Sequence, residues 1–228
     1  MTLQRDISTG EYYHIYNRGA FKNTLFKDQK DYVRFLFYIL YAQSPASFKN
    51  NARAVKTFSM QEGFGISSEY TNDIILNRVV ELTAFCVMPN HFHLIVKETA
   101  EGGIAQYLQR VGVGYTKYFN TKYRSTSGRI FENRYQSKHV ADNNYLLYLS
   151  AYIHRNPREL TAWKNKEFEY PWSSLQDLTE ANRWGGLLQA DSIADQFEMT
   201  ENSNYRDFVE TSTAKMFEEE ISELIKPT

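Results

Sequence analysis

Two histidines separated by one residue are the first feature of this sequence that could do chemistry. His91 and His93 lie in the segment HFHLIV, whose apolar and β-branched residues predict a strand. Alternate residues of a strand point to the same side, so both imidazoles would project from one face, about 6.6 Å apart along the chain. Neutral imidazole is a common metal ligand, although strand histidines also serve structural roles. The spacing therefore allows both rings to reach one metal ion.

A tyrosine on the next predicted helix is the second candidate. Tyr115 lies in segment 102–124, where apolar residues recur at helical spacing, and such a tyrosine usually belongs to a core. Gly112 and Gly114 each cost up to about 1 kcal/mol of helix stability, which is understandable if a bulky ligand approaches there. A phenol, with a pKa near about 10, attacks a phosphate only with help, and a metal ion can polarise the phosphoryl oxygen. We therefore interpret Tyr115 and the histidine pair as one mechanistic unit.

The elements that must position these residues follow from periodicity and from turn signals. Strands are predicted at 11–19, as an antiparallel pair within 79–98 that turns at Met88, Pro89 and Asn90, and at 128–140. Helices are predicted after the capping residue Asp28, at 102–124, and from 144 to a stop near Asn156 and Pro157. No regular structure is predicted for 44–68. The order strand, helix, strand pair, helix, strand, up to residue 140, indicates an α+β fold with helices on one face of a mainly antiparallel sheet.

The composition is that of a folded protein, with 42% hydrophobic and 23% charged residues. The single cysteine, Cys86, cannot form an internal disulfide, which is typical of a reducing compartment. Neither a signal segment nor a run of about 18 apolar residues is present. We therefore expect a cytoplasmic protein without a membrane partner.

Charge is unevenly distributed along the chain, although the net charge is only −1. Residues 101–140 contain seven Lys or Arg against two acidic residues, a net charge of +5, whereas residues 191–228 contain ten acidic residues against three basic ones, a net charge of −7. Such runs are usually solvated faces, but basic side chains can also contact phosphates. Arg110, Lys117, Arg129, Arg134 and Lys138 are the candidates for such contacts in this stretch, with surface solubility as the alternative role for each.

Six segments in the same order along the chain carry a family resemblance: YYHIYNRG, MPNHFHLIV, YTKYFN, GRIFENRYQS, YIHRNP and PWSS. Together they resemble the REP-associated tyrosine transposases, relatives of the single-tyrosine HUH transposases, from about residue 11 to residue 174. The resemblance implies a ferredoxin-like fold with the histidines on a central strand and the nucleophilic tyrosine on a helix facing it. It also implies Mg²⁺ or Mn²⁺, and a 5′-phosphotyrosine intermediate with a free 3′-hydroxyl.

By motif position, the resemblance makes His91 and His93 metal ligands and Tyr115 the nucleophile. In some relatives a polar side chain four residues beyond the nucleophile completes the metal site, and this position is Phe119 here. Asn120, one residue further, is therefore the predicted third ligand, with helix capping as its alternative role. His14 and Arg18 belong to the opening motif, so the resemblance predicts that His14 could shape the site and that Arg18 is a DNA-binding residue, together with Arg110, Lys117, Arg129, Arg134 and Lys138.

The resemblance predicts an endonuclease domain at 1–140 and a C-terminal helical extension with an acidic tail at 141–228. The implied function is that of a metal-dependent endonuclease and transposase that cuts single-stranded or hairpin DNA beside REP-like elements. Two alternatives remain: a domesticated hairpin-binding protein without productive cleavage, and a phosphodiesterase in which water attacks. A monomer and a homodimer are both compatible with the sequence.

Overall fold

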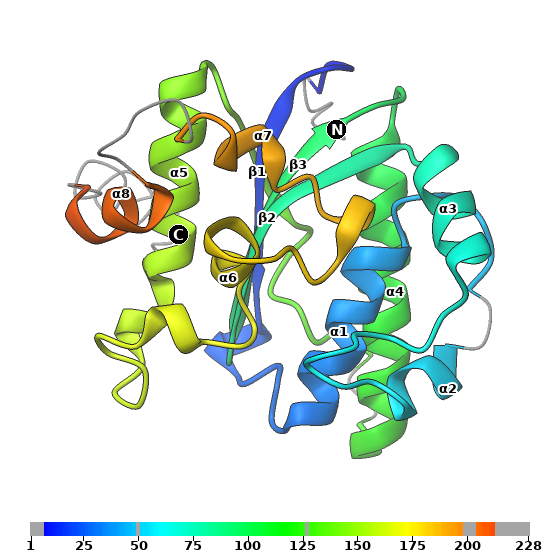
Figure 1. Ribbon diagram of the computed structural model, residues 1–228. Coiled ribbons are helices and arrows are strands. Elements are labelled where there is room, and N and C mark those ends of the chain that lie inside the picture. The colour runs from blue at the N-terminus through cyan, green and yellow to red at the C-terminus, as the bar shows by residue number, and fades with distance from the viewer. Residues whose placement is uncertain (1–6, 49–50, 126–127, 198–203, 213–228) are drawn as a thin grey trace.

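A four-stranded antiparallel sheet forms the centre of the molecule (Figure 1). The computed structural model describes residues 7–48, 51–125, 128–197 and 204–212. The strands are ordered β2-β3-β1-β4, and each neighbouring pair is antiparallel. With helices α1 and α4, the chain order is βαββαβ, as in ferredoxin-like folds, so the predicted fold is confirmed. The bounds are β1 (Tyr12–Arg18), α1 (Gln29–Tyr41), β2 (Val80–Met88), β3 (His91–Glu98), α4 (Gly103–Tyr123) and β4 (Gln136–His139).

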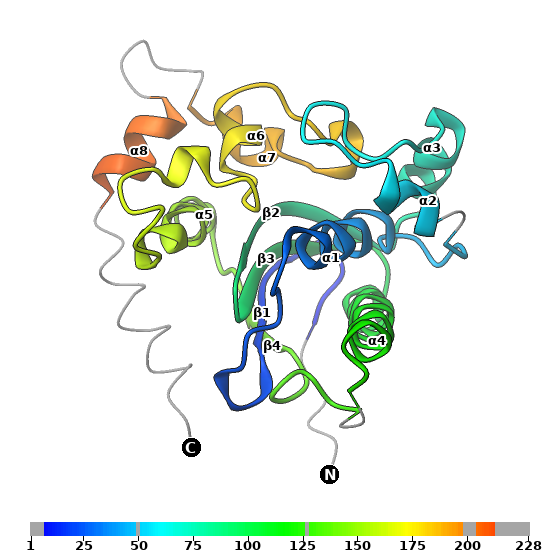
Figure 2. The same cartoon turned by 90° about the horizontal axis from the view of Figure 1, so that it is seen from below.

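Helices cover both faces of the sheet. Helices α1 and α4 pack on one face, and α5 (Asn143–Arg155) packs on the other, against β2 and β3 (Figure 2). Two consecutive residues of β3 mark the two sides. The Phe92 ring lies 4.9 Å from the Phe35 ring of α1, whereas the His93 ring lies 5.8 Å from the Tyr152 ring of α5. The two helices of the predicted βαββαβ order thus lie on one face, as expected, and α5 of the predicted C-terminal extension covers the other, so that β2 is buried along nearly its whole length.

Local signals fix the two helices of the first layer. Asp28 caps α1 by accepting a hydrogen bond from the Asp31 backbone N–H, and Asp31 returns the bond in a capping box. Asp31 is fully buried and also accepts hydrogen bonds from Tyr118, Lys122 and Tyr123 at the end of α4. The start of α1 and the end of α4 are thereby held together.

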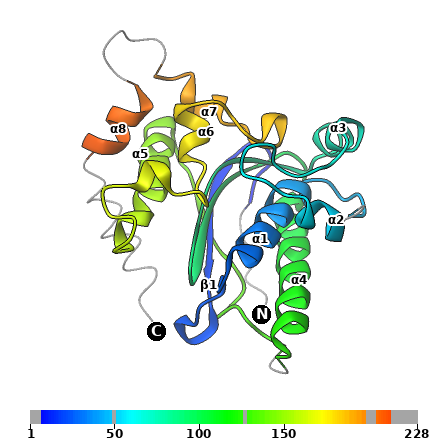
Figure 3. The same ribbon diagram turned by 60° about the horizontal axis from the view of Figure 1, so that its bottom comes forward.

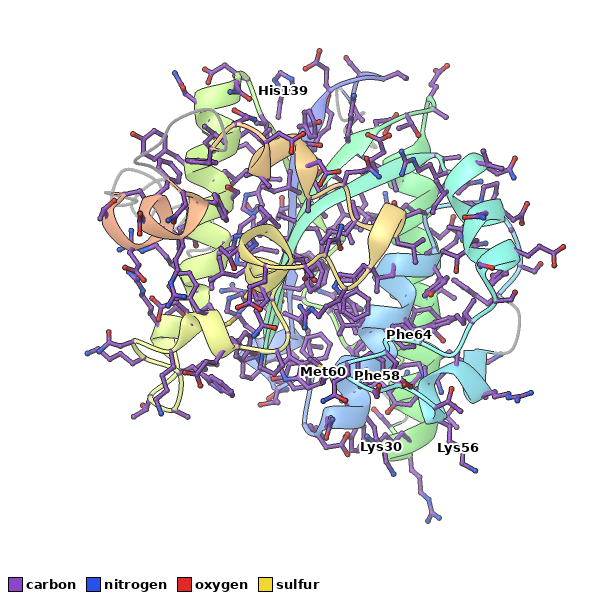
Figure 4. All side chains as sticks on the ribbon, in the orientation of Figure 1. Lys30, Lys56, Phe58, Met60, Phe64 and His139 are labelled. Carbon is purple, nitrogen blue, oxygen red and sulfur yellow. The ribbon has the colours of Figure 1, made fainter. Side chains whose placement is uncertain are left out.

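Two predicted boundaries differ from the structure. Helix α2 (Asn51–Lys56) lies within 44–68, for which no regular structure was expected, and α3 (Ser68–Leu76) begins at the end of that segment. The connection is ordered by aromatic packing: the Phe58 and Phe64 rings lie 4.7 Å apart near α1 (Figure 4). The strand expected over 128–140 is only four residues long, and residues 128–135 are mostly irregular.

The chain beyond β4 folds back onto β2. Val87 N–H donates to Trp172 O at 2.9 Å, and Ser174 N–H donates to Phe85 O at 2.9 Å. His154 of α5 is buried between the Ser174 hydroxyl, at 2.8 Å, and the Tyr205 hydroxyl, at 2.6 Å. The remaining elements are α6 (Leu175–Thr179), α7 (Asp191–Ala194), α8 (Tyr205–Thr211) and short 3-10 helices at Ala20–Lys22, Asn156–Glu159, Glu167–Glu169 and Gly185–Leu187.

Part of the acidic segment 191–228 lies outside the described residues, which end at 212. Across the residues that the structure describes, no helix combines the length and the apolar character needed to cross a membrane.

Candidate active site

Strand pairing gathers polar residues on the sheet face that α5 covers. Tyr16 pairs with His93 and Arg18 pairs with His91 across β1 and β3. Directly paired residues of antiparallel strands project to the same side. His14 lies on this face as well, because it is two residues from Tyr16 along β1. We call this surface the histidine face.

His93 is held in an orientation suited to a metal ligand. Its side chain is buried, and its Nδ1 lies 2.9 Å from His14 Nε2. Its Nε2 is buried and has no hydrogen-bond partner in the described part of the chain. When Nδ1 carries the proton and donates it to His14, the Nε2 lone pair is available to a metal ion. Burial lowers the pKa of His93 well below its usual value, so the ring is neutral, as a ligand must be.

His91 is also held through its Nδ1, but its Nε2 has a neighbour. Its Nδ1 lies 2.8 Å from Asn90 Oδ1, and its Nε2 lies 3.4 Å from Asn156 Oδ1. The ring is partly exposed, and its centroid lies 5.1 Å from that of His93. Burial, together with nearby Arg18, lowers the pKa of His91.

Helix α5 brings a tyrosine and an amide to the two histidines. Tyr152 is partly exposed, and its ring lies 5.8 Å from the His93 ring, at an interplanar angle of 87°. Asn156 follows one helical turn later. Its Nδ2 donates to Tyr152 O at 3.0 Å, which turns its Oδ1 towards His91. A tyrosine ring and an amide oxygen, one helical turn apart, therefore lie against the histidine pair.

The donor set fits a divalent ion held by two imidazoles and one amide oxygen. Within the described residues, no group of three or more His, Cys, Asp or Glu side chains is placed to hold a metal ion. The buried Nε2 of His93 without a partner is the observation that indicates a ligand, since buried polar atoms rarely lack one. His91, His93 and Asn156 could supply three ligands, and imidazole together with carbonyl oxygen suits Mn²⁺ well.

Tyr115 does not lie on the histidine face, which corrects the interpretation of Tyr115 and the histidines as one unit. Its ring packs 5.3 Å from Phe26 and 5.1 Å from Phe35, in the layer formed by α1 and α4. The side chain is fully buried, and its hydroxyl donates to Leu25 O at 2.7 Å. Burial raises the pKa of Tyr115 far above its usual value. The sheet itself separates this hydroxyl from the two histidines.

The glycines beside Tyr115 serve helix packing and a cavity on the far side of the sheet from the histidines. A Cβ added at Gly114 would lie 2.8 Å from a ring carbon of Tyr38, so this glycine lets α1 and α4 approach. Gly112 faces open space and lines a cavity of about 470 Å³ between α4 and residues 131–135. Asn120, the predicted third ligand, donates from Nδ2 to Gly128 O at 3.4 Å. It belongs to α4 and therefore to the layer on the other side of the sheet.

Two of the six predicted DNA-binding residues lie on the histidine face. Arg18 forms an ion pair with Glu132, in which Nη2 lies 3.1 Å from Oε1. Lys138 pairs with His14 across β1 and β4, and its ammonium lies 5.2 Å from the centre of the Tyr145 ring. Both cations are therefore near any phosphate held by the histidines.

The other four predicted residues lie elsewhere. The Arg110 guanidinium donates to Pro45 O at 3.1 Å and lies 4.5 Å from the Phe48 ring, so it anchors a loop. Lys117 is exposed on α4. Arg129 donates to Phe131 O at 2.9 Å, and Arg134 is exposed beside the cavity that Gly112 lines.

Comparison with known proteins agrees with the fold. Residues 66–156 match the sequence model of a protein family described as "Transposase IS200 like", and this range contains both histidines, Tyr152 and Asn156. A solved structure of a REP-associated tyrosine transposase bound to a REP hairpin is 14% identical, with a TM-score of 0.50. The match covers 78% of this chain and 84% of that one. No match was found among curated proteins.

The resemblance to the REP-associated tyrosine transposases is thereby confirmed. Periodicity along the sequence predicted only a helix at Tyr152 and a helix stop at Asn156. The signal was nevertheless present in YIHRNP: Tyr152 and Asn156 are four residues apart, the spacing at which a polar residue follows the nucleophile in some relatives. Residues 115 and 119 fail this test, because residue 119 is phenylalanine.

Proposed function

We propose that the protein is a metal-dependent endonuclease of transposase type that cuts and rejoins single-stranded DNA with Tyr152 as nucleophile. One observation carries the proposal: a partly exposed tyrosine and an amide, one turn apart on α5, meet the two histidines of β3. The family match and the likeness to a hairpin-bound transposase support a DNA substrate. The proposed site combines residues from before and after residue 140. Residues 1–140, predicted as a separate domain, would therefore not contain a complete nuclease site.

In the proposed reaction, Tyr152 Oη attacks the phosphorus of one phosphodiester. A bond forms between Oη and phosphorus, the bond from phosphorus to the 3′ oxygen breaks, and the strand is left with a 5′-phosphotyrosine. Oη gives up its proton and the 3′ oxygen takes one, so the products are the covalent adduct and a free 3′-hydroxyl. The reverse attack by a 3′-hydroxyl rejoins DNA without an external energy source.

The chain's own groups each have a task in this step. His91, His93 and Asn156 would hold Mg²⁺ or Mn²⁺, which polarises a phosphoryl oxygen and offsets the negative charge that develops there. Lys138 and Arg18, on the same face, would bind neighbouring phosphates. The Asn156 bond to the backbone of Tyr152 fixes the distance between the nucleophile and the third ligand.

Trapping the covalent adduct tests the proposal. A labelled hairpin with a single-stranded flank is incubated with Mn²⁺, and protein that carries label after denaturation is counted. Wild type should form the adduct, and Tyr152→Phe should form none while still binding DNA, because only the hydroxyl is lost.

Two matched variants serve as controls. Tyr148→Phe changes another tyrosine of α5, whose ring packs 5.2 Å from Phe208 of α8, and it should leave the adduct unchanged. Tyr115→Phe should do so too. An adduct that survives in Tyr152→Phe but disappears in Tyr115→Phe would make Tyr115 the nucleophile after all. Tight binding without any adduct would favour a hairpin-binding protein.

The form of the substrate gives a second test. The scissile phosphate must approach Tyr152 and the histidines together, and a flexible single strand bends into that geometry more easily than a stiff duplex. We expect cutting of the single strand and of the hairpin flank, and none of a blunt duplex. Equal cutting of the duplex would contradict the transposase-like reaction.

A further inference from the structure

The loop after β1 carries an unusually exposed aromatic residue. Phe21 is 90% exposed, the highest value among the exposed large apolar side chains of the described residues. Its backbone is left-handed, with φ of 56°, and so is that of Lys22, with φ of 60°. Two consecutive non-glycine residues in this region store backbone strain, which tends to persist where function requires it. Core packing does not account for a phenylalanine presented to solvent in this way.

The loop is held firmly in place. Gly19 N–H donates to Asn90 O at 2.7 Å, and Ala20 N–H donates to Ile130 O at 2.8 Å. A Cβ at Gly19 would lie 2.1 Å from Asn23 O, so the turn requires glycine there. The loop projects from the end of the sheet, where Figure 3 draws it in blue. Phe21 is therefore exposed by a defined turn.

The same turn is connected to the candidate active site. Asn90, which accepts the bond from Gly19, also lies 2.8 Å from His91 Nδ1 through its side-chain oxygen. Arg18, the last residue of β1, pairs directly with His91. The loop therefore lies next to His91, where a DNA strand bound at the proposed site could reach it.

We propose that Phe21 is a stacking platform for one unpaired base of the bound strand, within a few nucleotides of the cleaved phosphate. The inference rests on the proposed function. An exposed ring face accepts any unpaired base, and the neighbouring cation Lys22 would accompany the backbone of the same strand. A base stacked on Phe21 would hold the strand at a fixed position relative to the metal ligands.

Base deletion combined with substitution tests this proposal. Binding is measured by fluorescence anisotropy in a Tyr152→Phe background, with a hairpin whose flanking bases are removed one at a time by abasic nucleotides. Phe21→Ala should weaken binding of the intact strand about 10-fold, the loss expected for one stacked base, and Phe21→Trp should retain affinity. When one particular base is removed, the protein with Phe21 should lose the same roughly 10-fold affinity. On that abasic strand, Phe21→Ala should bind as well as the protein with Phe21.

A second readout locates the base directly. 2-Aminopurine at that position should be quenched by the protein with Phe21 and much less by Phe21→Ala. The matched control is Leu76→Ala, which removes another apolar side chain, 83% exposed, from α3. Helix α3 lies on the opposite side of the molecule from α5 (Figures 1 and 2), so this variant should bind as before.

The outcomes separate this proposal from the proposed function. If the protein forms the covalent adduct but Phe21→Ala binds every strand like Leu76→Ala, stacking is overturned while the nuclease assignment stands. Stacking would also be overturned if Phe21→Ala lowered the affinity by the same factor on every strand, whichever base had been removed. A change of oligomeric state in Phe21→Ala, with DNA binding unchanged, would make Phe21 a protein contact instead. If no DNA binds at all, the proposed function fails first.

Discussion

His14 Nε2 lies 2.9 Å from His93 Nδ1, and the two buried imidazole rings stack at an interplanar angle of 17°. Only one proton can lie between these nitrogens. When His93 donates it, His93 Nε2 is left as an acceptor directed away from His14. His14 would then set the tautomer of a metal ligand without touching the ion, as the outer partners of metal-bound histidines commonly do.

The first prediction follows from this contact. His14→Ala should weaken Mn²⁺ binding about 10- to 100-fold, the range typical for loss of such a partner. Isothermal calorimetry on metal-free protein measures the affinity without any DNA. His14→Gln, whose amide oxygen can still accept a hydrogen bond from His93 Nδ1–H, should retain more affinity than His14→Ala. Unchanged affinity in a folded His14→Ala variant would remove His14 from the site.

Tyr115 should contribute to the stability of the fold and not to adduct formation. Tyr115→Phe removes the buried hydrogen bond to Leu25 O and leaves that carbonyl without its partner, at a cost of about 1 to 3 kcal/mol. Urea unfolding should give a lower free energy of unfolding, while adduct formation by the folded protein stays at the wild-type level. A variant with normal stability and no adduct would contradict both halves of this prediction.

Removal of the metal ion should abolish formation of the covalent adduct while DNA binding is retained. Excess chelator should abolish adduct formation, and restored Mn²⁺ should support it at least as well as Mg²⁺, because imidazole is a poor ligand for Mg²⁺. His91→Ala should lose the adduct in either metal. Full adduct formation in excess chelator would contradict the proposed requirement for a metal ion.

The stability of the protein should fall in mild acid. Burial lowers the pKa of His154 to about 3, between the Ser174 and Tyr205 hydroxyls. Between that value and the unfolded pKa near about 6.5, the unfolded chain binds a proton that the folded protein excludes. Stability is therefore full above about pH 6.5, and lowering the pH costs about 1.4 kcal/mol per unit for this residue. Unfolding of wild type and of His154→Gln at several pH values should give a shallower slope in the variant; equal slopes would contradict the assignment.

The sequence predicted the sheet and its main helices because their residues alternate with the periods of a strand and of a helix. Asp28 and Pro157 marked the start of α1 and the stop of α5 through local backbone chemistry. The face of the sheet that each helix covers depends on contacts between distant segments. No local pattern along β2 could reveal them, because both of its faces are buried.

The same distinction applies to the candidate site. His91 and His93 are defined by local spacing, whereas the choice of tyrosine required knowing which helix faces them. The helical spacing around Tyr115 was a core pattern, and Gly114 accommodates the Tyr38 ring. Phe21 could not be singled out from the sequence, because its exposure and its left-handed backbone are visible only in the folded protein.

The division of the proposed site between β3 and α5 has a consequence during synthesis. A ribosome that has made 140 residues has already made both histidines, but neither Tyr152 nor Asn156. Even with α5 complete, the hydroxyls of Ser174 and Tyr205 that enclose His154 are still to be added. An unfinished or truncated chain would therefore carry the proposed metal-binding histidines without the proposed nucleophile held beside them.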